Sequence, residues 1–259
     1  MSTASSTSSV SVIVPCYNAE ATLARTLDSC IAQPEAAQII VVDDGSTDAS
    51  LDLAHAYARR DARILVLTMP ANGGAARARN WAALHASEAL IAFMDADDDY
   101  LHGALAAACA YLSDHPHEAS IRLDVEFAGF PAEIVSHPDF ARHAAVLSNT
   151  VPSGLVIRRP VFVLFGGFPD DAFFRRNGGE DGAFSWALLK AFGNRRLIDG
   201  KRVRMHYHHG IHAERYFRIE MGMQPRDEAD TDEAFRLSRH FVDTALNAVA
   251  TVRGLQVLA

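Results

Sequence analysis

The sequence of 259 residues is poor in cysteine: it has three, Cys16, Cys30 and Cys109, far apart in the chain. An odd number of widely spaced cysteines in apolar surroundings argues against a disulfide framework and predicts buried thiols in a reducing compartment. A chain of this length can bury enough apolar surface to fold without disulfides or a structural metal.

The chain also lacks long apolar runs and a surplus of positive charge. No stretch approaches the roughly 20 apolar residues that span a bilayer. Residues 1–9 are almost all Ser, Thr and Ala, which predicts a disordered tail rather than a secretory signal. The formal net charge of −8 argues against a nucleic-acid binder, because such domains usually carry a basic face. We therefore expect a cytoplasmic protein, and a peripheral membrane contact stays open.

The first hundred residues alternate between strand and helix patterns. Short, continuous apolar runs predict four strands buried on both faces, at residues 10–15, 38–42, 63–68 and 89–94. Helical spacing of apolar residues predicts helices between them, at residues 21–31, 51–57 and 75–86. This alternation predicts an α/β fold with a mostly parallel central sheet flanked by helices.

The second half is less regular. Its patterns predict a helix, a strand, a short helix, a turn, a helix and a strand, at residues 101–112, 153–158, 161–165, 166–169, 182–192 and 196–207. Asp98 or Asp99 is expected to cap the first of these helices. Residues 115–149 are broken by prolines and histidines and receive no assignment.

Residues 230–252 predict a long amphipathic helix, a C-terminal helical extension. Its apolar face is expected to pack on its own domain, with a homodimer or a membrane-surface contact as alternatives. The acidic start over residues 227–233 disfavours anionic lipid.

A polar cluster follows each of the four predicted strands. The clusters are Pro15-Cys16-Tyr17-Asn18, residues 43–48, Asn72-Gly73-Gly74 and residues 95–99. Ligands of parallel sheets bind at the carboxyl ends of the strands, so the clusters should converge on one crevice. That convergence is a stronger signal than any single motif.

Asp95-Ala96-Asp97 directly follows a buried strand. Two carboxylates there are costly unless a positive group lies between them, and hard oxygen ligands suit Mg²⁺ or Mn²⁺. The alternative is a solvated turn whose aspartates cap a helix, and the motif alone does not distinguish the two.

Other clusters suggest contacts with a nucleotide. Asp43 or Asp44 could accept a hydrogen bond from a base N–H, although Ser46 or Asp48 could simply cap the next helix. Backbone groups of the Asn72 cluster, with Arg77 or Arg79, could approach a diphosphate. We expect one of the two arginines to face solvent instead.

Two later clusters complete the set. Glu180 and Asp181 open a helix, where acids are favoured by the helix dipole, and one of them could serve as a general base. Four histidines lie within residues 206–212, so one metal ligand among them is plausible and the choice is open.

In this order, the pieces resemble the inverting nucleotide-sugar transferases of glycosyltransferase family 2, which have the GT-A fold with its Rossmann-like sheet. The matching pieces are VIVPCYNAE at 12–20, VVDDGSTD at 41–48, NGG at 72–74 with ARN at 78–80, FMDADD at 93–98, FGGF at 165–168 and ED at 180–181.

The resemblance implies a UDP-sugar donor, a divalent metal and an Asp181 general base with Glu180 beside it. The implied metal ligands are Asp95, Asp97 and a histidine, with His209 the first choice. The implied nucleotide-sugar contacts are Pro15, Tyr17, Asn18, Glu20, Asp44, Asn72, Gly73, Arg77, Arg79, Asp95 and Ala96. Residues 10–112 would form the nucleotide-sugar-binding half, 113–212 the acceptor-binding and catalytic half, and 213–259 the helical extension.

The sequence departs from the family pattern on the acceptor side. Residues 182–186 after the Glu-Asp pair lack the arginine-containing stretch that the family often has, and the segment before Ser153 is short and rich in histidine. The acceptor, whether glycan, lipid-linked or a small molecule, therefore stays open. Alternative functions are a non-catalytic sugar-nucleotide-binding module and, third, a nucleotidyltransferase.

Overall fold

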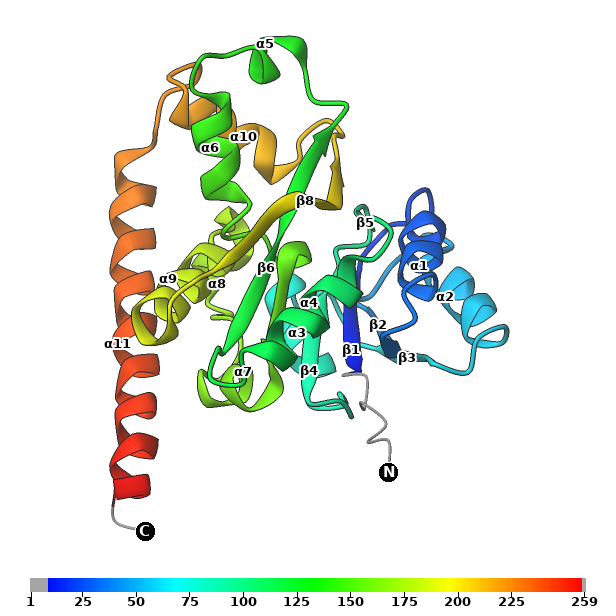
Figure 1. The fold of residues 1–259 in the computed structure, drawn as a ribbon. Coiled ribbons are helices and arrows are strands. Elements are labelled where there is room, and N and C mark those ends of the chain that lie inside the picture. The colour runs from blue at the N-terminus through cyan, green and yellow to red at the C-terminus, as the bar shows by residue number, and fades with distance from the viewer. Residues whose placement is uncertain (1–8, 258–259) are drawn as a thin grey trace.

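The computed structural model describes residues 9–257, so the predicted tail lies outside the described residues except for Ser9. Eight strands form one sheet in the order β3-β2-β1-β4-β7-β6-β8-β5 (Figure 1). The strands are β1 (Val10–Cys16), β2 (Ala36–Asp43), β3 (Ile64–Thr68), β4 (Leu90–Phe93), β5 (Asp99–Tyr100), β6 (Ser120–Ala128), β7 (Leu155–Arg158) and β8 (Arg196–His206). The first four strands are parallel, as predicted, whereas β7 is antiparallel to both β4 and β6.

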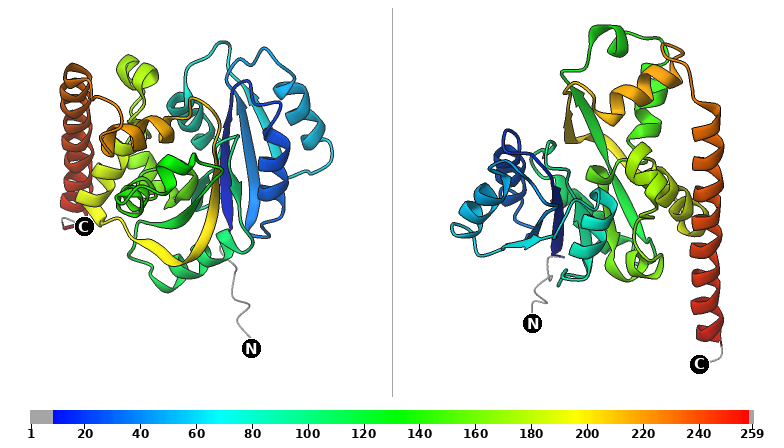
Figure 2. Two further views of the ribbon diagram at one scale, coloured as in Figure 1. Left: turned by 90° about the horizontal axis from the view of Figure 1, so that it is seen from above. Right: turned by 180° about the vertical axis from the view of Figure 1, so that it is seen from behind.

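Helices cover both faces of the sheet (Figure 2). They are α1 (Leu23–Ile31), α2 (Ser50–Ala58), α3 (Ala75–Ala83), α4 (Ala104–Asp114), α5 (Ala132–Val135), α6 (Phe140–Leu147), α7 (Arg159–Leu164), α8 (Ala172–Asn177), α9 (Glu180–Phe192), α10 (His212–Glu220) and α11 (Glu228–Val257), with a 3₁₀ turn, η1 (Pro152–Gly154). Across residues 9–257, no helix combines the length and apolar character that crossing a membrane requires.

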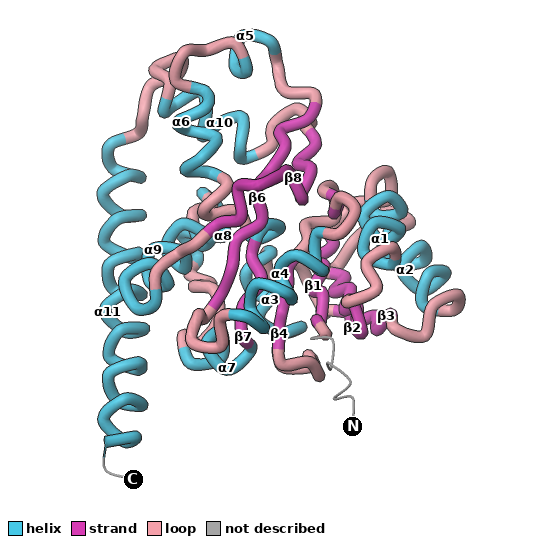
Figure 3. Tube along the Cα trace, in the orientation of Figure 1, coloured by secondary structure: helices cyan, strands magenta, loops and turns pink. Residues whose placement is uncertain are grey.

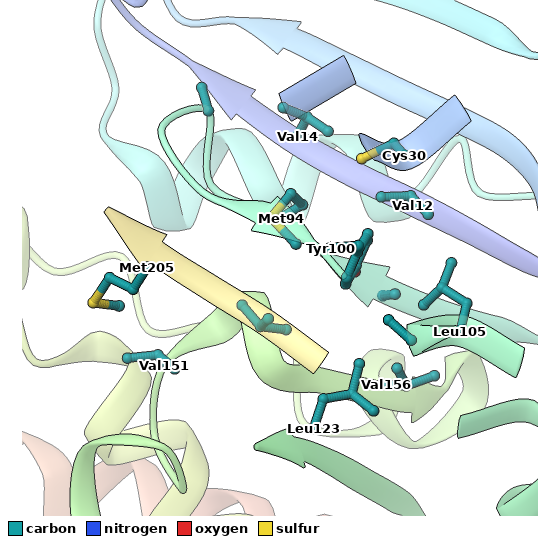
Figure 4. Close-up of a cluster of buried hydrophobic side chains, with 14 of the residues drawn as sticks. Val12, Val14, Cys30, Met94, Tyr100, Leu105, Leu123, Val151, Val156 and Met205 are labelled. Carbon is teal, nitrogen blue, oxygen red and sulfur yellow. The ribbon is translucent and has the colours of Figure 1, made fainter. Parts of the chain in front are cut away.

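The core consists of two layers because strand side chains alternate between the faces of the sheet. Val12 and Val14 of β1 join a cluster with Cys30 of α1, and Figure 4 shows these side chains beside Met94 and Tyr100. Ile13, between the two valines, joins the opposite cluster, which includes residues of α3, α7 and α9. The continuous apolar runs therefore report strands that are buried on both faces for β1, β2 and β4. The prediction is wrong for β3, which lies at the edge of the sheet and is only partly buried.

The three cysteines are buried, free thiols, in agreement with the sequence. Burial is the main cause that raises the pKa of Cys30 to about 12, so this thiol stays neutral. The C-terminal helix packs on its own chain: α11 lies along α9, and the rings of Phe235 and Trp186 stack with centroids 5.5 Å apart.

Two expectations need correction. The unassigned segment contains β6, which pairs along most of its length with β8 in the middle of the fold (Figure 3). In addition, neither Asp98 nor Asp99 caps α4, because that helix begins at Ala104, after Gly103 in a left-handed conformation. The two aspartates instead contact Ser153 and His206.

Candidate functional site

A cleft of about 460 Å³ lies at the carboxyl ends of β1, β2 and β4, and we call it the large cleft. All four predicted clusters contribute to its wall, together with one residue from the turn after β8. Its lining residues are Pro15, Cys16, Tyr17, Asn18, Ala19, Ala21, Thr22, Asp44, Asn72, Gly74, Ala75, Arg79, Asp95, Ala96, Asp97 and His208. The parallel strands thus bring the clusters together as the sequence predicts.

Asp44 fixes one wall of the large cleft. Its side chain is buried, and its two carboxylate oxygens accept hydrogen bonds from the backbone N–H groups of Gly73 (2.8 Å) and Gly74 (2.7 Å). Gly74 has φ of +90°, a conformation that favours glycine. Asp44 therefore holds the glycine loop in place, and each oxygen keeps a second lone pair with which it could accept a further donor.

Glu20 is predicted to line the nucleotide pocket, but it does not line the large cleft. Its carboxylate instead accepts a hydrogen bond from the N–H of Ala49 (2.9 Å), the residue that precedes α2. An acidic side chain is stabilised there by the unpaired N–H groups of the helix start. Asn18 remains in the cleft wall, with φ of +49°, and its side-chain oxygen accepts the N–H of Thr47 (2.8 Å).

Arg79 is the cationic centre of the site. Its guanidinium is 4% exposed and forms ion pairs with Asp95 (2.5 Å) and Glu180 (3.2 Å), residues that are far apart in the sequence. Arg77, two residues earlier on α3, faces away from the large cleft and pairs with Asp170 near the surface (3.4 Å). The prediction that one of the two arginines faces outward therefore agrees with the structure, and Gly73 likewise lies outside the large cleft.

The histidine nearest to the aspartate motif is His208, so its position favours it over His209 as the candidate metal ligand. His208 Nε2 lies 2.9 Å from Asp97 Oδ2, and both residues line the large cleft. His209 is exposed and does not line the cleft, because β8 ends at His206 and the following turn breaks the strand alternation. Burial, followed by the charge of Asp95, raises the pKa of Asp97, and His208 opposes the shift.

Asp98 and Asp99 support the Asp95-Ala96-Asp97 motif through contacts outside the large cleft. Asp98 is buried and accepts a hydrogen bond from the hydroxyl of Ser153 (2.9 Å), whose oxygen in turn accepts the N–H of Asp95 (3.1 Å). Burial raises the pKa of Asp98 well above its ordinary value, and Asp97 and Asp95 add to the shift. Asp99 pairs with His206, so the first histidine of the cluster is also used structurally.

A second, smaller pocket of about 270 Å³ adjoins the large cleft, with Gly74, Ala75 and Arg79 in both walls. It contains Glu180 and Asp181 at the start of α9. The Asp181 carboxylate accepts the N–H of Gly182 (2.7 Å). Its pKa is raised to about 7, mainly by burial and next by the charge of Glu180.

Several residues of the small pocket are not identified from the sequence, among them Pro152, Asp170, Phe174, Arg175 and His212. His212 was only one of four clustered histidines, and in the structure it packs against Gly178. A side chain at Gly178 would place its Cβ 3.1 Å from His212 Nδ1. In the sequence, only the glycine pair Gly178-Gly179 before Glu180 indicates that His212 lies so close to the backbone here.

Comparisons with known proteins bear on the family and the fold. Residues 11–135 match the model of the family described as glycosyl transferase family 2. The succinoglycan biosynthesis protein ExoU of Rhizobium meliloti is 41% identical over 103 residues, which are 40% of this chain and 30% of that protein. The chain therefore covers less than a third of the length of this relative.

Solved structures resemble nearly the whole chain. TarS 1–349 of S. aureus, in complex with UDP-GlcNAc, has a TM-score of 0.68 at 23% identity, over 90% of this chain and 66% of that one. The mannosyltransferase PcManGT of Pyrobaculum calidifontis, in complex with GDP-Man and Mn²⁺, has a TM-score of 0.61 at 19% identity, over 96% and 75%. The fold is the GT-A fold that the motifs predict.

Proposed function

We propose that this chain, which belongs to glycosyltransferase family 2 through residues 11–135, transfers a sugar from a nucleoside-diphosphate sugar to an acceptor hydroxyl. One observation carries the proposal: the large cleft and the small pocket adjoin across Gly74, Ala75 and Arg79. The large cleft suits a nucleotide, and the small pocket holds a carboxyl group with a raised pKa. A donor and an acceptor could therefore meet beside Asp181.

A UDP-sugar is the favoured donor. Asp44 lies in the wall of the large cleft with lone pairs left over, so it could accept the imide N–H of uracil. Tyr17 is 49% exposed at the same cleft and offers a ring face for stacking. UDP-GlcNAc is bound in TarS and GDP-Man in PcManGT, which supports a nucleoside-diphosphate sugar and leaves the base to experiment.

The residues of the large cleft fit a divalent metal ion. Within the described residues, no three potential ligands cluster tightly enough to hold a metal by themselves. Asp97 and His208 nevertheless offer one oxygen and one nitrogen side by side, and Mg²⁺ or Mn²⁺ commonly takes one or two carboxylates plus substrate phosphates. Asp95 is the third candidate, although its Oδ1 accepts from Arg79. A metal bound there would neutralise charge on the diphosphate.

The residues of the chain then perform a single displacement with inversion. Asp181 takes the proton of the acceptor hydroxyl while the acceptor oxygen forms a bond to the anomeric carbon. The bond from that carbon to the diphosphate oxygen breaks, and the nucleoside diphosphate leaves. Because Arg79 is buried next to both cavities, it adds positive charge beside the departing group.

A thermal-shift screen of nucleotide sugars with Mn²⁺ tests donor binding, because a ligand that binds the native state raises the melting temperature. UDP-sugars should give the largest shifts. Asp97→Ala should abolish the metal-dependent part of donor binding in calorimetry. Asp181→Asn should bind the donor as the wild type does while losing nearly all turnover, and retained turnover would refute the base assignment.

The product released from the donor separates the rival functions. A glycosyltransferase releases the nucleoside diphosphate, which phosphate-coupled or chromatographic assays detect, even when water replaces the acceptor. A nucleotidyltransferase would join a sugar phosphate to a nucleoside triphosphate and release pyrophosphate from the triphosphate. A non-catalytic module would bind the donor and leave it intact over long incubation.

A further inference from the structure

Arg122 is a buried cation for which the proposed mechanism has no use. It lies on β6, is 1% exposed, and is among the largest fully buried side chains of the described chain. Its guanidinium donates to three neutral acceptors: the carbonyl of Val151 (2.7 Å), the hydroxyl of Ser185 (2.6 Å) and the amide oxygen of Asn194 (3.2 Å). Among residues 9–257, it forms no ion pair with a carboxylate.

Arg122 lacks a carboxylate partner although acidic side chains lie near it in the chain. Glu118 and Asp124 flank Arg122 along the chain, but each is paired with a cation at the beginning of β8 or just before it. Arg195 binds Glu118 at 2.8 Å, and Arg196 binds Asp124 at 3.4 Å. The charge of Arg122 is therefore left uncompensated in a buried site, which is costly. Burial lowers its pKa to about 9.

The contacts of Arg122 place it behind the catalytic pocket. Ser185 lies four residues after Asp181 on α9, so the two side chains share one face of the helix. Val151 directly precedes Pro152, which lines the small pocket with Asp181. The guanidinium therefore sits beneath the floor of that pocket. Arg122 is one of the two cations that oppose the raised pKa of Asp181, and the other is Arg79.

Arg79 cannot serve Asp181 alone because it is already shared between Asp95 and Glu180. Other charged groups that line the small pocket with Asp181 are Glu180 from α9, Arg175 from α8, His212 from α10 and Asp170 from the loop before α8. Arg175 is exposed and screened by solvent, whereas Arg122 acts through the protein interior, where charge interactions are stronger.

We propose that Arg122 is a positioning residue for the transfer reaction, whose buried and unpaired charge keeps Asp181 ionised and ready to accept a proton. This inference rests on the proposed function only through the role of Asp181. The hydrogen bonds to Ser185 and Asn194 fix the position of the guanidinium relative to the first turn of α9.

The test is a pH titration of Asp181 by NMR in protein labelled with ¹³C at the aspartate carboxyl carbons, with Asp181→Asn identifying the signal. Arg122→Met should raise the pKa of Asp181 by about one unit or more, as removal of a nearby opposite charge does. Arg122→Lys should keep the pKa close to the wild-type value. Asn194→Asp, which places a carboxylate on the guanidinium, should raise it without removing Arg122 and serves if Arg122→Met does not fold.

Ser185→Ala is the matched control, because it removes one hydrogen bond of Arg122 and leaves the charge. It should lower thermal stability without moving the pKa. Equal pKa values of Asp181 in the wild type, Arg122→Met and Asn194→Asp would overturn the proposal. The titration does not depend on turnover: a shifted pKa together with an active Asp181→Asn enzyme would refute the base role and leave the inference about Arg122 intact.

Discussion

Replacement of Arg79 should show how strongly the two cavities are linked. Arg79→Met keeps the aliphatic stem but leaves the carboxylates of Asp95 and Glu180 without their cation. Their side chains are 27% and 16% exposed, so both are largely removed from water. Breaking a buried ion pair costs about 3 to 5 kcal/mol, and partial exposure places this case near 3 kcal/mol.

The assay is thermal or urea unfolding. For a domain of this size, about 3 kcal/mol corresponds to a fall in Tm of roughly 6 to 12 °C. Arg79→Lys keeps the charge but loses the planar fork that reaches both carboxylates, so we expect it to cost about 1.5 to 3 kcal/mol, the value of one charged hydrogen bond. A double-mutant cycle with Glu180→Gln isolates the pair across the two cavities.

Arg77→Met is the matched control because Arg77 lies on the same helix and forms a surface ion pair at 3.4 Å, with both partners 49% exposed. That pair should contribute about 0.5 kcal/mol or less. Equal losses of stability in the Arg77 and Arg79 variants would refute the view that Arg79 is a structural centre. An unchanged Tm in Arg79→Lys would show that the second ion pair contributes nothing.

Three further predictions concern the site. His208→Ala should weaken Mn²⁺-dependent donor binding at least about tenfold in calorimetry, while His209→Ala should bind as the wild type does. Glu20→Gln should lower the free energy of unfolding by about 1 kcal/mol through loss of the charge at the start of α2, with donor affinity unchanged. The folded-state pKa of Asp181 is raised from 3.8 to about 7, so its contribution to stability is present at low pH and lost as pH rises through this window. Asp181→Asn should therefore unfold at a higher temperature than the wild type above pH 7 and at the same temperature below about pH 3.8, measured by calorimetry.

The part of the fold that forms the large cleft was predictable because its signals are local. Each parallel strand is a continuous apolar run with a polar cluster at or soon after its end, and the sheet geometry then brings those residues together. β6 was missed because the prolines and histidines around it hid its pattern, in which Arg122, Asp124 and Glu126 alternate with apolar residues as in a half-buried strand. Partners of these three side chains lie about 60 to 80 residues later, on α9, the loop after it and β8. The alternation predicts a solvated face, whereas Arg122 and Asp124 are buried, and no local pattern shows that distant residues will bind them.

Individual roles were harder to predict than locations for the same reason. Glu20 and Asp44 belong to motifs at the edge of the large cleft, yet one stabilises α2 and the other holds the glycine loop. The aspartates predicted to cap α4 form contacts with Ser153 and His206 instead. Each of these assignments is decided by a hydrogen bond between segments that are far apart in the chain.

The division of the site between the two halves of the chain bears on specificity. The family match ends at residue 135, so it covers the whole lining of the large cleft except for His208. Asp181, Arg175 and His212 of the small pocket all lie beyond it, on elements with weak sequence patterns. A nucleotide diphosphate presents the same groups whatever sugar it carries, whereas acceptors differ in shape and charge. Acceptor choice should therefore depend on α8, α9 and the start of α10. Exchange of Arg175 or His212 should alter acceptor preference, while the dissociation constant of the donor stays unchanged.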